Sequence, residues 1–106
     1  EKNITEMLAD IPQYYATPEI RLPSTEKEKF LIVEQARDYF KKYYELIDID
    51  GARIIFPHGW GLLRASNTGP EIIFRCEGDS PTARDEIKKI ILDYLQSIGY
   101  QVADNL

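Results

Sequence analysis

A polar segment with the sequence RASNTGP occupies residues 64–70, between two apolar runs. A plain β-hairpin needs about two to five turn residues, usually Asn, Gly or Asp, and has no use for an arginine beside a Ser-Asn-Thr triplet. A guanidinium group pairs bidentately with phosphate or carboxylate oxygens, and hydroxyl and backbone donors complete such a site. The residues leave two interpretations open: an anion site, or a polar turn in which Arg64 pairs with a surface carboxylate.

The spacing of these residues predicts how they face a ligand. Side chains alternate along a strand, so Arg64 and Ser66 are expected to point the same way at a strand end. Asn67 and Thr68 add further donors beyond the strand. Gly69 leaves room for a backbone N–H to approach a ligand closely, or for a positive φ.

Other residues that could do chemistry are weaker candidates. Asp48 and Asp50 are spaced as two metal ligands could be, but aspartates in turns are more often turn formers. His58 is the only histidine and has no paired nucleophile or base, which favours a solvated turn residue over a catalyst. Cys76, the only cysteine, lies in an apolar run, so we expect a buried, unreactive thiol and a reducing compartment.

Two helices are predicted by capping residues and by apolar spacing. The first, over residues 26–44, begins within the capping-box sequence TEKE (25–28) and carries an apolar stripe. That stripe consists of Phe30, Val33, Ala36, Phe40 and Tyr43. The second follows Ser80-Pro81, ends at Gly99, and carries Ile87, Ile90, Ile91, Tyr94, Leu95 and Ile98 at helical spacing.

The strands are predicted from β-forming runs bounded by turn residues. Residues 14–22 read as an edge strand or a bulged strand because of Pro18. Residues 45–48 and 52–56 flank an Asp-Gly turn, and residues 60–65 and 71–77 flank the polar segment. A short helix is also predicted over residues 4–10. The fold class is therefore α+β: an antiparallel sheet of about four to five strands with two helices packed on one face.

Composition excludes several classes of function. The chain of 106 residues has the size of one domain, and its formal charge of −5 has the wrong sign for nonspecific binding to nucleic acid. No apolar segment approaches the roughly 20 residues of a membrane span, and no signal-peptide pattern opens the chain. We expect a cytoplasmic fragment of a longer protein, without a nucleic-acid or membrane partner.

The order of residues from 59 to 77, GWGLLRASNTGPEIIFRCE, resembles the phosphate-binding motif in the C-terminal domain of the α-D-phosphohexomutases, the family of phosphomannomutase and phosphoglucomutase. The segments TPEIR (17–21), KF (29–30) and IDGAR (49–53) resemble further landmarks of that family in the same order. The resemblance implies the fourth domain of the enzyme, with a fold similar to half of TATA-box-binding protein. It would comprise residues 13–100, after a lead-in segment (1–12) and before a tail (101–106).

The resemblance also implies roles for individual residues. Arg64, Ser66, Asn67 and Thr68 would hold the phosphate of a hexose phosphate, with Gly69 beside them, and Arg75 occupies the position of the family's second arginine. Gly69 and Cys76 depart from the residues that relatives often carry there, which puts substrate preference in doubt. The family's phosphoserine and its Mg²⁺ ligands belong to other domains, so this fragment is expected to have no catalytic residue, metal or cofactor of its own. Its partners would be mannose or glucose 1- and 6-phosphates and the other domains of the same chain.

Two alternatives belong to other classes. A free-standing module that binds a phospho-ligand or a protein could share the same fold without an enzymatic parent. An autonomous enzyme is disfavoured, because the sequence lacks a paired nucleophile and base and has no metal-binding cluster.

Overall fold

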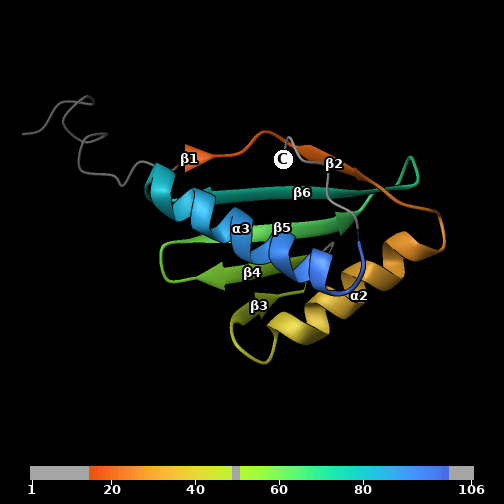
Figure 1. The fold of residues 1–106 in the computed structure, drawn as a ribbon, viewed down its shortest axis with the longest axis horizontal. Helices are drawn as coiled ribbons and strands as arrows, with labels where there is room; N and C mark the ends of the chain where they lie inside the picture. The colour runs from red at the N-terminus through yellow and green to blue at the C-terminus, as the bar shows by residue number, and fades with distance from the viewer. Residues whose placement is uncertain (1–14, 49–50, 101–106) are drawn as a thin grey trace, which may run out of the picture.

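The computed structural model describes residues 15–48 and 51–100, which form an α+β fold as expected (Figure 1). The predicted helix over residues 4–10 lies outside the described residues, as do positions 49–50 of the predicted Asp-Gly turn. The elements in chain order are β1 (Tyr15–Ala16), β2 (Ile20–Pro23), α2 (Glu28–Phe40), β3 (Glu45–Ile47), β4 (Ala52–Phe56), β5 (Gly59–Ala65), β6 (Glu71–Gly78) and α3 (Pro81–Ser97).

The strands form one antiparallel sheet in the order β1-β6-β5-β4-β3, with β2 pairing with β6 next to β1. The predicted edge strand is thus two short strands on either side of Pro18, which is why the sheet has six strands and not four to five. Between them, Thr17 stays attached to β6. Its N–H donates to the Cys76 carbonyl at 2.9 Å, and its hydroxyl accepts from the Cys76 N–H at 3.1 Å.

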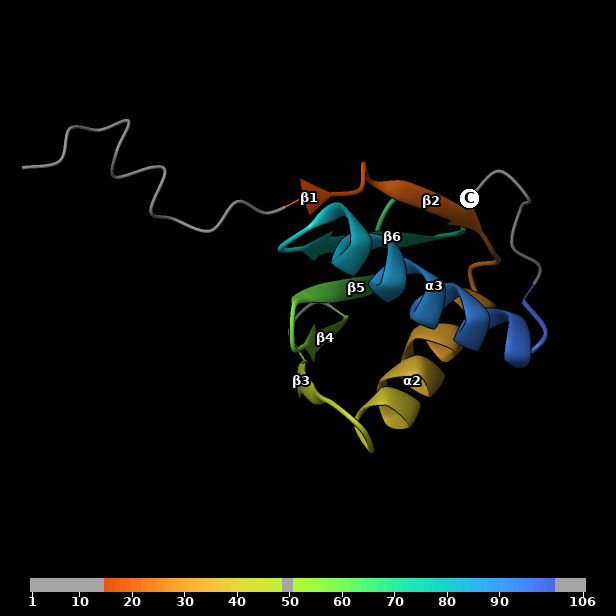
Figure 2. The same cartoon turned by 60° about the vertical axis from the view of Figure 1, so that its left-hand side comes forward.

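Both helices cover the same face of the sheet, as predicted (Figures 1 and 2). Helix α3 packs on β5 and β6, and helix α2 packs on β4 and β5. Alternate residues of the central strands point between the sheet and the helices and are buried there. The core includes Phe40, Ile54, Leu63, Ile72, Phe74, Ile91 and Leu95. No helix of the described residues lies on the opposite face of the sheet (Figure 2).

Helix α2 is shorter than predicted, and its buried stripe matches the prediction at Val33, Ala36 and Phe40 but not at its two ends. It spans Glu28–Phe40, and the side chains of Phe30 and Tyr43 are 58% and 66% exposed. The buried positions are Lys29, Val33, Ala36 and Phe40. Lys29 takes the first buried position because its ammonium group finds partners there, and Tyr43 lies in the turns after the helix ends. At the other end, Thr25 accepts a hydrogen bond from the Glu28 N–H at 2.9 Å, as one half of the predicted capping box.

Helix α3 begins and ends where the sequence predicted. The Ser80 hydroxyl accepts from the Ala83 N–H at 3.0 Å, Pro81 is the first helical residue, and Gly99 follows the helix with φ +94°. Ile90 and Ile98 were predicted on the apolar face but are 37% and 39% exposed, so the buried stripe of α3 is narrower than the predicted one.

Gly51 packs closely against the C-terminal end of strand β5, where the polar segment begins. Its φ is +124°, and a Cβ there would collide with the Leu63 carbonyl and lie 3.0 Å from the Arg64 Cα. Only glycine satisfies both constraints. Gly51, immediately before β4, therefore lies directly against the backbone that carries Arg64.

Candidate functional site

The polar segment forms the connection between β5 and β6. Strand β5 ends at Ala65 and β6 starts at Glu71, and the Ser66 N–H donates to the Glu71 carbonyl at 2.9 Å. The Glu71 N–H donates back to the Gly69 carbonyl at 2.8 Å. Residues 66–70, hereafter the 66–70 loop, therefore have a defined backbone shape before any ligand binds.

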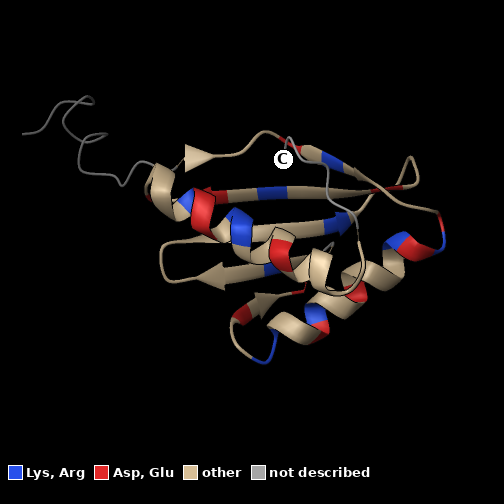
Figure 3. Ribbon diagram, viewed as in Figure 1, with Lys and Arg blue, Asp and Glu red and all other residues tan. Residues whose placement is uncertain are grey.

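One arginine lies on each of β2, β4, β5 and β6 (Figure 3). They are Arg21, Arg53, Arg64 and Arg75. The strand register places Arg21 and Arg64 on either side of Ile73, and Arg53 and Arg75 on either side of Leu62. Because the residues that alternate with them are buried under the helices, all four arginines lie on the uncovered face of the sheet.

These arginines differ in the groups that interact with their guanidinium groups. Arg21 pairs with Glu19 at 3.3 Å and with Glu71 at 3.2 Å, and the Arg53 guanidinium lies 4.5 Å from the ring centre of Trp60. Arg64 and Arg75, in contrast, have no carboxylate partner within salt-bridge distance among residues 15–48 and 51–100. The expected alternative for Arg64, a pair with a surface carboxylate, is therefore not seen in the described part of the chain.

Ser66 and Thr68 interact with each other inside the loop. Ser66 is only 1% exposed, and its hydroxyl accepts from the Thr68 N–H at 3.2 Å and lies 3.3 Å from the Thr68 hydroxyl. The expectation that Ser66 and Arg64 point the same way rested on strand alternation, but the strand ends at Ala65, so that alternation does not extend to Ser66. The hydroxyl of Ser66 stabilises the loop from within.

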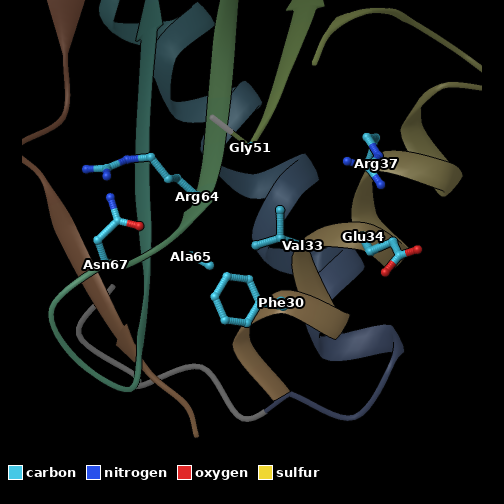
Figure 4. Close-up of a pocket in the computed structure, with 8 residues that line it drawn as sticks. All are labelled: Phe30, Val33, Glu34, Arg37, Gly51, Arg64, Ala65 and Asn67. Carbon is cyan, nitrogen blue, oxygen red and sulfur yellow. The ribbon is translucent and has the colours of Figure 1, made fainter. Parts of the chain in front are cut away.

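Arg64 and Asn67 point to the same side of the loop (Figure 4). Arg64 is half-buried at the end of β5, and Asn67 is exposed. Gly69 does not have the positive φ that was one expectation for it, and a Cβ there would touch only the Glu71 carboxylate, at 3.2 Å. Neither the backbone conformation nor the surrounding packing therefore requires glycine at position 69.

A cavity of about 340 Å³ lies between the start of α2 and the end of β5 (Figure 4). It is lined by Phe30, Val33, Glu34, Arg37, Gly51, Arg64, Ala65 and Asn67. Arg37, on the helix side, is neutralised by Asp48 at 3.0 Å. Arg64 lines the cavity from the β5 side, but its guanidinium extends away from Phe30 and Val33, toward the side of Asn67 (Figure 4).

Lys29 also belongs to this site, and sequence reasoning missed what it does. Its ammonium group donates to the carbonyls of Ser66 at 2.7 Å and Gly69 at 3.0 Å, although the residue is only 2% exposed. A lysine four residues before the buried Val33, on the apolar side of a helix, was the signal that could have found it.

The weaker candidates show no catalytic arrangement. His58 is largely exposed and lies 3.1 Å from an Asp79 oxygen, as a solvated turn residue does. Cys76 is buried, and burial raises the pKa of its thiol, so the thiol stays protonated near neutral pH. Asp48 pairs with Arg37, while Asp50 lies outside the described residues.

Residues 15–48 and 51–100 contain neither a metal-binding cluster nor a membrane-spanning helix. No group of three or more His, Cys, Asp or Glu side chains there could hold a metal ion. No helix in that part of the chain combines the length and the apolar character needed to cross a bilayer.

Comparison with known proteins gives consistent results. The family model described as phosphoglucomutase/phosphomannomutase, C-terminal domain, matches residues 19–93. A phosphomannomutase/phosphoglucomutase from Pseudomonas aeruginosa is 33% identical over 99 residues, which are 92% of this chain and 21% of the relative. A phosphoglucomutase from Neisseria meningitidis serogroup A is 42% identical over 89 residues, which are 81% of this chain and 19% of the relative.

A solved structure extends the comparison to the fold. The crystal structure of a phosphoglucomutase/phosphomannomutase family protein from Burkholderia thailandensis matches with a TM-score of 0.72 and 29% identity, over 91% of this chain and 20% of that one. This chain therefore spans about a fifth of the length of the relatives that it matches.

Proposed function

Because the chain belongs to the phosphoglucomutase/phosphomannomutase family, as its C-terminal domain, we propose that its 66–70 loop binds the phosphate group of a hexose phosphate within a mutase. In this proposal residues 13–100 are the phosphate-binding domain, residues 1–12 lead in from a preceding domain, and residues 101–106 are a tail. The groups that bind phosphate are the side chains of Arg64, Ser66, Asn67, Thr68 and Arg75 and the backbone at Gly69.

The observation that carries the proposal is the state of Arg64. A guanidinium group at a strand end, with no carboxylate partner among residues 15–48 and 51–100, lies beside a loop whose backbone is already ordered. Phosphate is the kind of oxyanion that a guanidinium binds bidentately, and an ordered loop reduces the entropy lost on binding. Ser66 would meet phosphate only if its hydroxyl exchanged part of its bonding to Thr68 for the ligand.

The reaction proposed for the whole enzyme is interconversion of hexose 1-phosphate and hexose 6-phosphate. A phosphoserine in another domain donates its phosphoryl group, a bisphosphorylated sugar forms and turns around, and the other phosphate returns to the serine. Each phosphate of the bisphosphorylated sugar must then bind in turn at the same phosphate site, the 66–70 loop. A loop that binds phosphate and does not contact the rest of the sugar meets that requirement.

The domain contributes positioning in this scheme. In this proposal the Mg²⁺ ligands expected of the whole enzyme belong to other domains, as its phosphoserine does. We predict that the chain of 106 residues has no mutase activity by itself, because nucleophile and metal ligands lie elsewhere. A coupled assay that detected turnover by a rigorously purified sample would contradict this assignment.

Phosphate binding can be tested by amide NMR titration of this chain with mannose 1-phosphate, glucose 1-phosphate and unphosphorylated mannose. A few charge-assisted hydrogen bonds on an open surface imply a dissociation constant of about a millimolar or weaker. We expect both sugar phosphates to shift the amides of residues 64–69, free mannose to shift none of them, and Arg64→Ala to abolish the effect.

Two results would reject the proposal. Shifts as strong with free mannose as with its phosphate would mean that the surface recognises sugar and not phosphate. Shifts clustered far from Arg64, or unchanged in Arg64→Ala, would place the phosphate elsewhere on the domain.

A further inference from the structure

Lys29 has an environment unlike that of any surface lysine. Its ammonium group donates to the Ser66 carbonyl at 2.7 Å and to the Gly69 carbonyl at 3.0 Å, and it forms an ion pair with the Glu26 carboxylate at 2.8 Å. The side chain is 3% exposed, whereas that of Glu26 is 70% exposed. A buried charge is tolerated only where it is paired and hydrogen-bonded, and here two of the three partners are backbone atoms of one loop.

We infer that Lys29 is a positioning residue for phosphate binding: from below the 66–70 loop, it fixes the loop backbone so that the N–H of Asn67 faces the ligand. This inference rests on the proposed function and assigns to it a residue that does not itself touch the phosphate. Helix α2 thereby contributes to the site from about forty residues earlier in the sequence.

The argument depends on the geometry of the peptide unit. The peptide that joins Ser66 to Asn67 is planar and trans, so its C=O and N–H point in opposite directions. Because the Ser66 carbonyl points at Lys29, the Asn67 N–H points away from Lys29. Asn67 is exposed, and its N–H has no acceptor among residues 15–48 and 51–100. A rotated Ser66–Asn67 peptide would turn that donor inward and present a carbonyl oxygen to an anion.

The Gly69 carbonyl supports the same shape at the other side of the loop. It accepts from the Lys29 ammonium group at 3.0 Å and from the Glu71 N–H at 2.8 Å. The next residue, Pro70, has no N–H of its own, and its carbonyl accepts from the Ser24 N–H at 2.7 Å. Lys29 is thus the one side-chain donor among those described that joins both ends of the loop, at Ser66 and at Gly69.

Lys29 is not assigned as a phosphate ligand in this arrangement, since its ammonium group already donates to two loop carbonyls and pairs with the Glu26 carboxylate. An apolar residue of similar volume would fill the space but would leave the Ser66 carbonyl without its described partner. The loss would then fall on loop geometry and on phosphate affinity, and not only on stability.

The test compares Lys29→Met, which removes the ammonium group, with Glu26→Gln, which keeps an acceptor for it and does not contact the loop. Each variant is titrated with inorganic phosphate and with mannose 1-phosphate at constant ionic strength, and its unfolding by urea is measured separately. We expect Lys29→Met to bind phosphate about tenfold more weakly and to shift the ligand-free amide of Asn67. We expect Glu26→Gln to bind within about twofold of the parent chain, because its exposed pair contributes little.

The conservative variant Lys29→Arg separates positioning from simple support of the fold. It keeps a buried cation with several donors, so we expect it to recover part of the affinity that Lys29→Met loses. If Lys29→Met does not fold, Lys29→Gln replaces it, because the shorter amide can still donate to one loop carbonyl. A purely structural lysine would change the urea midpoint and leave the phosphate affinity of the folded protein unchanged.

The outcomes distinguish the two proposals. If the parent chain binds phosphate through Arg64 while a folded neutral variant at position 29 binds equally well, the role of Lys29 is wrong and the proposed function stands. If the parent chain shows no phosphate-dependent shift at residues 64–69, the proposed function fails and this inference fails with it.

Discussion

The two connections of strand β5 differ in where their polar groups point. At its start, the turn from β4 contains only Pro57 and His58, and the His58 imidazole pairs with Asp79 in solvent. At its end, the 66–70 loop has a buried ammonium group below it and an arginine beside it without a described acidic partner. Both connections are polar in sequence and join neighbouring antiparallel strands.

The comparison shows that polar composition does not by itself mark a binding loop. The turn at the start of β5 has its polar groups satisfied by Asp79, whose N–H donates to the His58 carbonyl at 2.9 Å and whose carboxylate lies 3.1 Å from the His58 imidazole. The 66–70 loop takes acceptors and donors from elsewhere in the fold and leaves Arg64 and Asn67 available. A candidate binding loop differs from an ordinary turn in two ways: contacts from the rest of the fold order its backbone, and its exposed donors have no partner within the described residues.

The largest expected effect tests how tightly each connection is packed. Gly59→Ala should destabilise the protein by about 3 kcal/mol, because its Cβ would collide with the Glu77 carbonyl and lie 2.8 Å from the Gly78 Cα. Gly69→Ala should change stability by less than about 0.5 kcal/mol, because its Cβ would meet only the movable Glu71 carboxylate. Urea unfolding of both variants measures the difference, and equal losses would show that the loop is as closely packed as the turn.

The next effect concerns the ligand. Arg64→Ala should weaken phosphate binding about tenfold or more, which corresponds to loss of one or two charge-assisted hydrogen bonds of roughly 1.5 kcal/mol or more. His58→Ala, at the other end of the same strand, should leave phosphate affinity unchanged. The same amide titration measures both. A phosphate response that needs His58 and tolerates Arg64→Ala would reverse the assignment of the two ends.

The fold was predictable from the sequence because its signals are local. The Ser80-Pro81 start and the Gly99 end of α3, the pairing of β3 with β4, and the two strands that flank the RASNTGP segment all follow from neighbouring residues. Cys76 is buried as its apolar run predicted.

The errors occurred where long-range contacts override a local pattern. Phe30 continues the apolar spacing of α2, yet Lys29 takes the buried position because two carbonyls of a loop 37 and 40 residues away accept its hydrogen bonds. Apolar periodicity contains no information about those acceptors. The sequence therefore identified the candidate loop but not Lys29, whose ammonium group donates to the loop carbonyls. The roles of the loop residues in binding phosphate stay predictions.

A smaller effect separates two serines that make similar bonds. The hydroxyls of Ser66 and Ser80 each accept from a backbone N–H, of Thr68 at 3.2 Å and of Ala83 at 3.0 Å. Replacing either serine by alanine should cost about 1 kcal/mol of stability. Only Ser66→Ala should also weaken phosphate binding, by a few-fold, because its bond lies inside the loop. If both variants bind phosphate normally, the internal bond of the loop does not affect the ligand.

The smallest effect belongs to the exposed pair of His58 and Asp79. Asp79→Asn should alter stability by less than about 0.5 kcal/mol, because an ion pair between solvated side chains is screened and orders two mobile groups. Urea unfolding at low and at high salt measures this directly, with Lys89→Gln, which removes the exposed pair with Asp93, as the matched control. A loss from Asp79→Asn much above that of the control would mean that the turn at the start of β5 depends on its polar pair. In that case the two ends of β5 would differ in ligand binding, but both connections would depend on polar side chains for their stability.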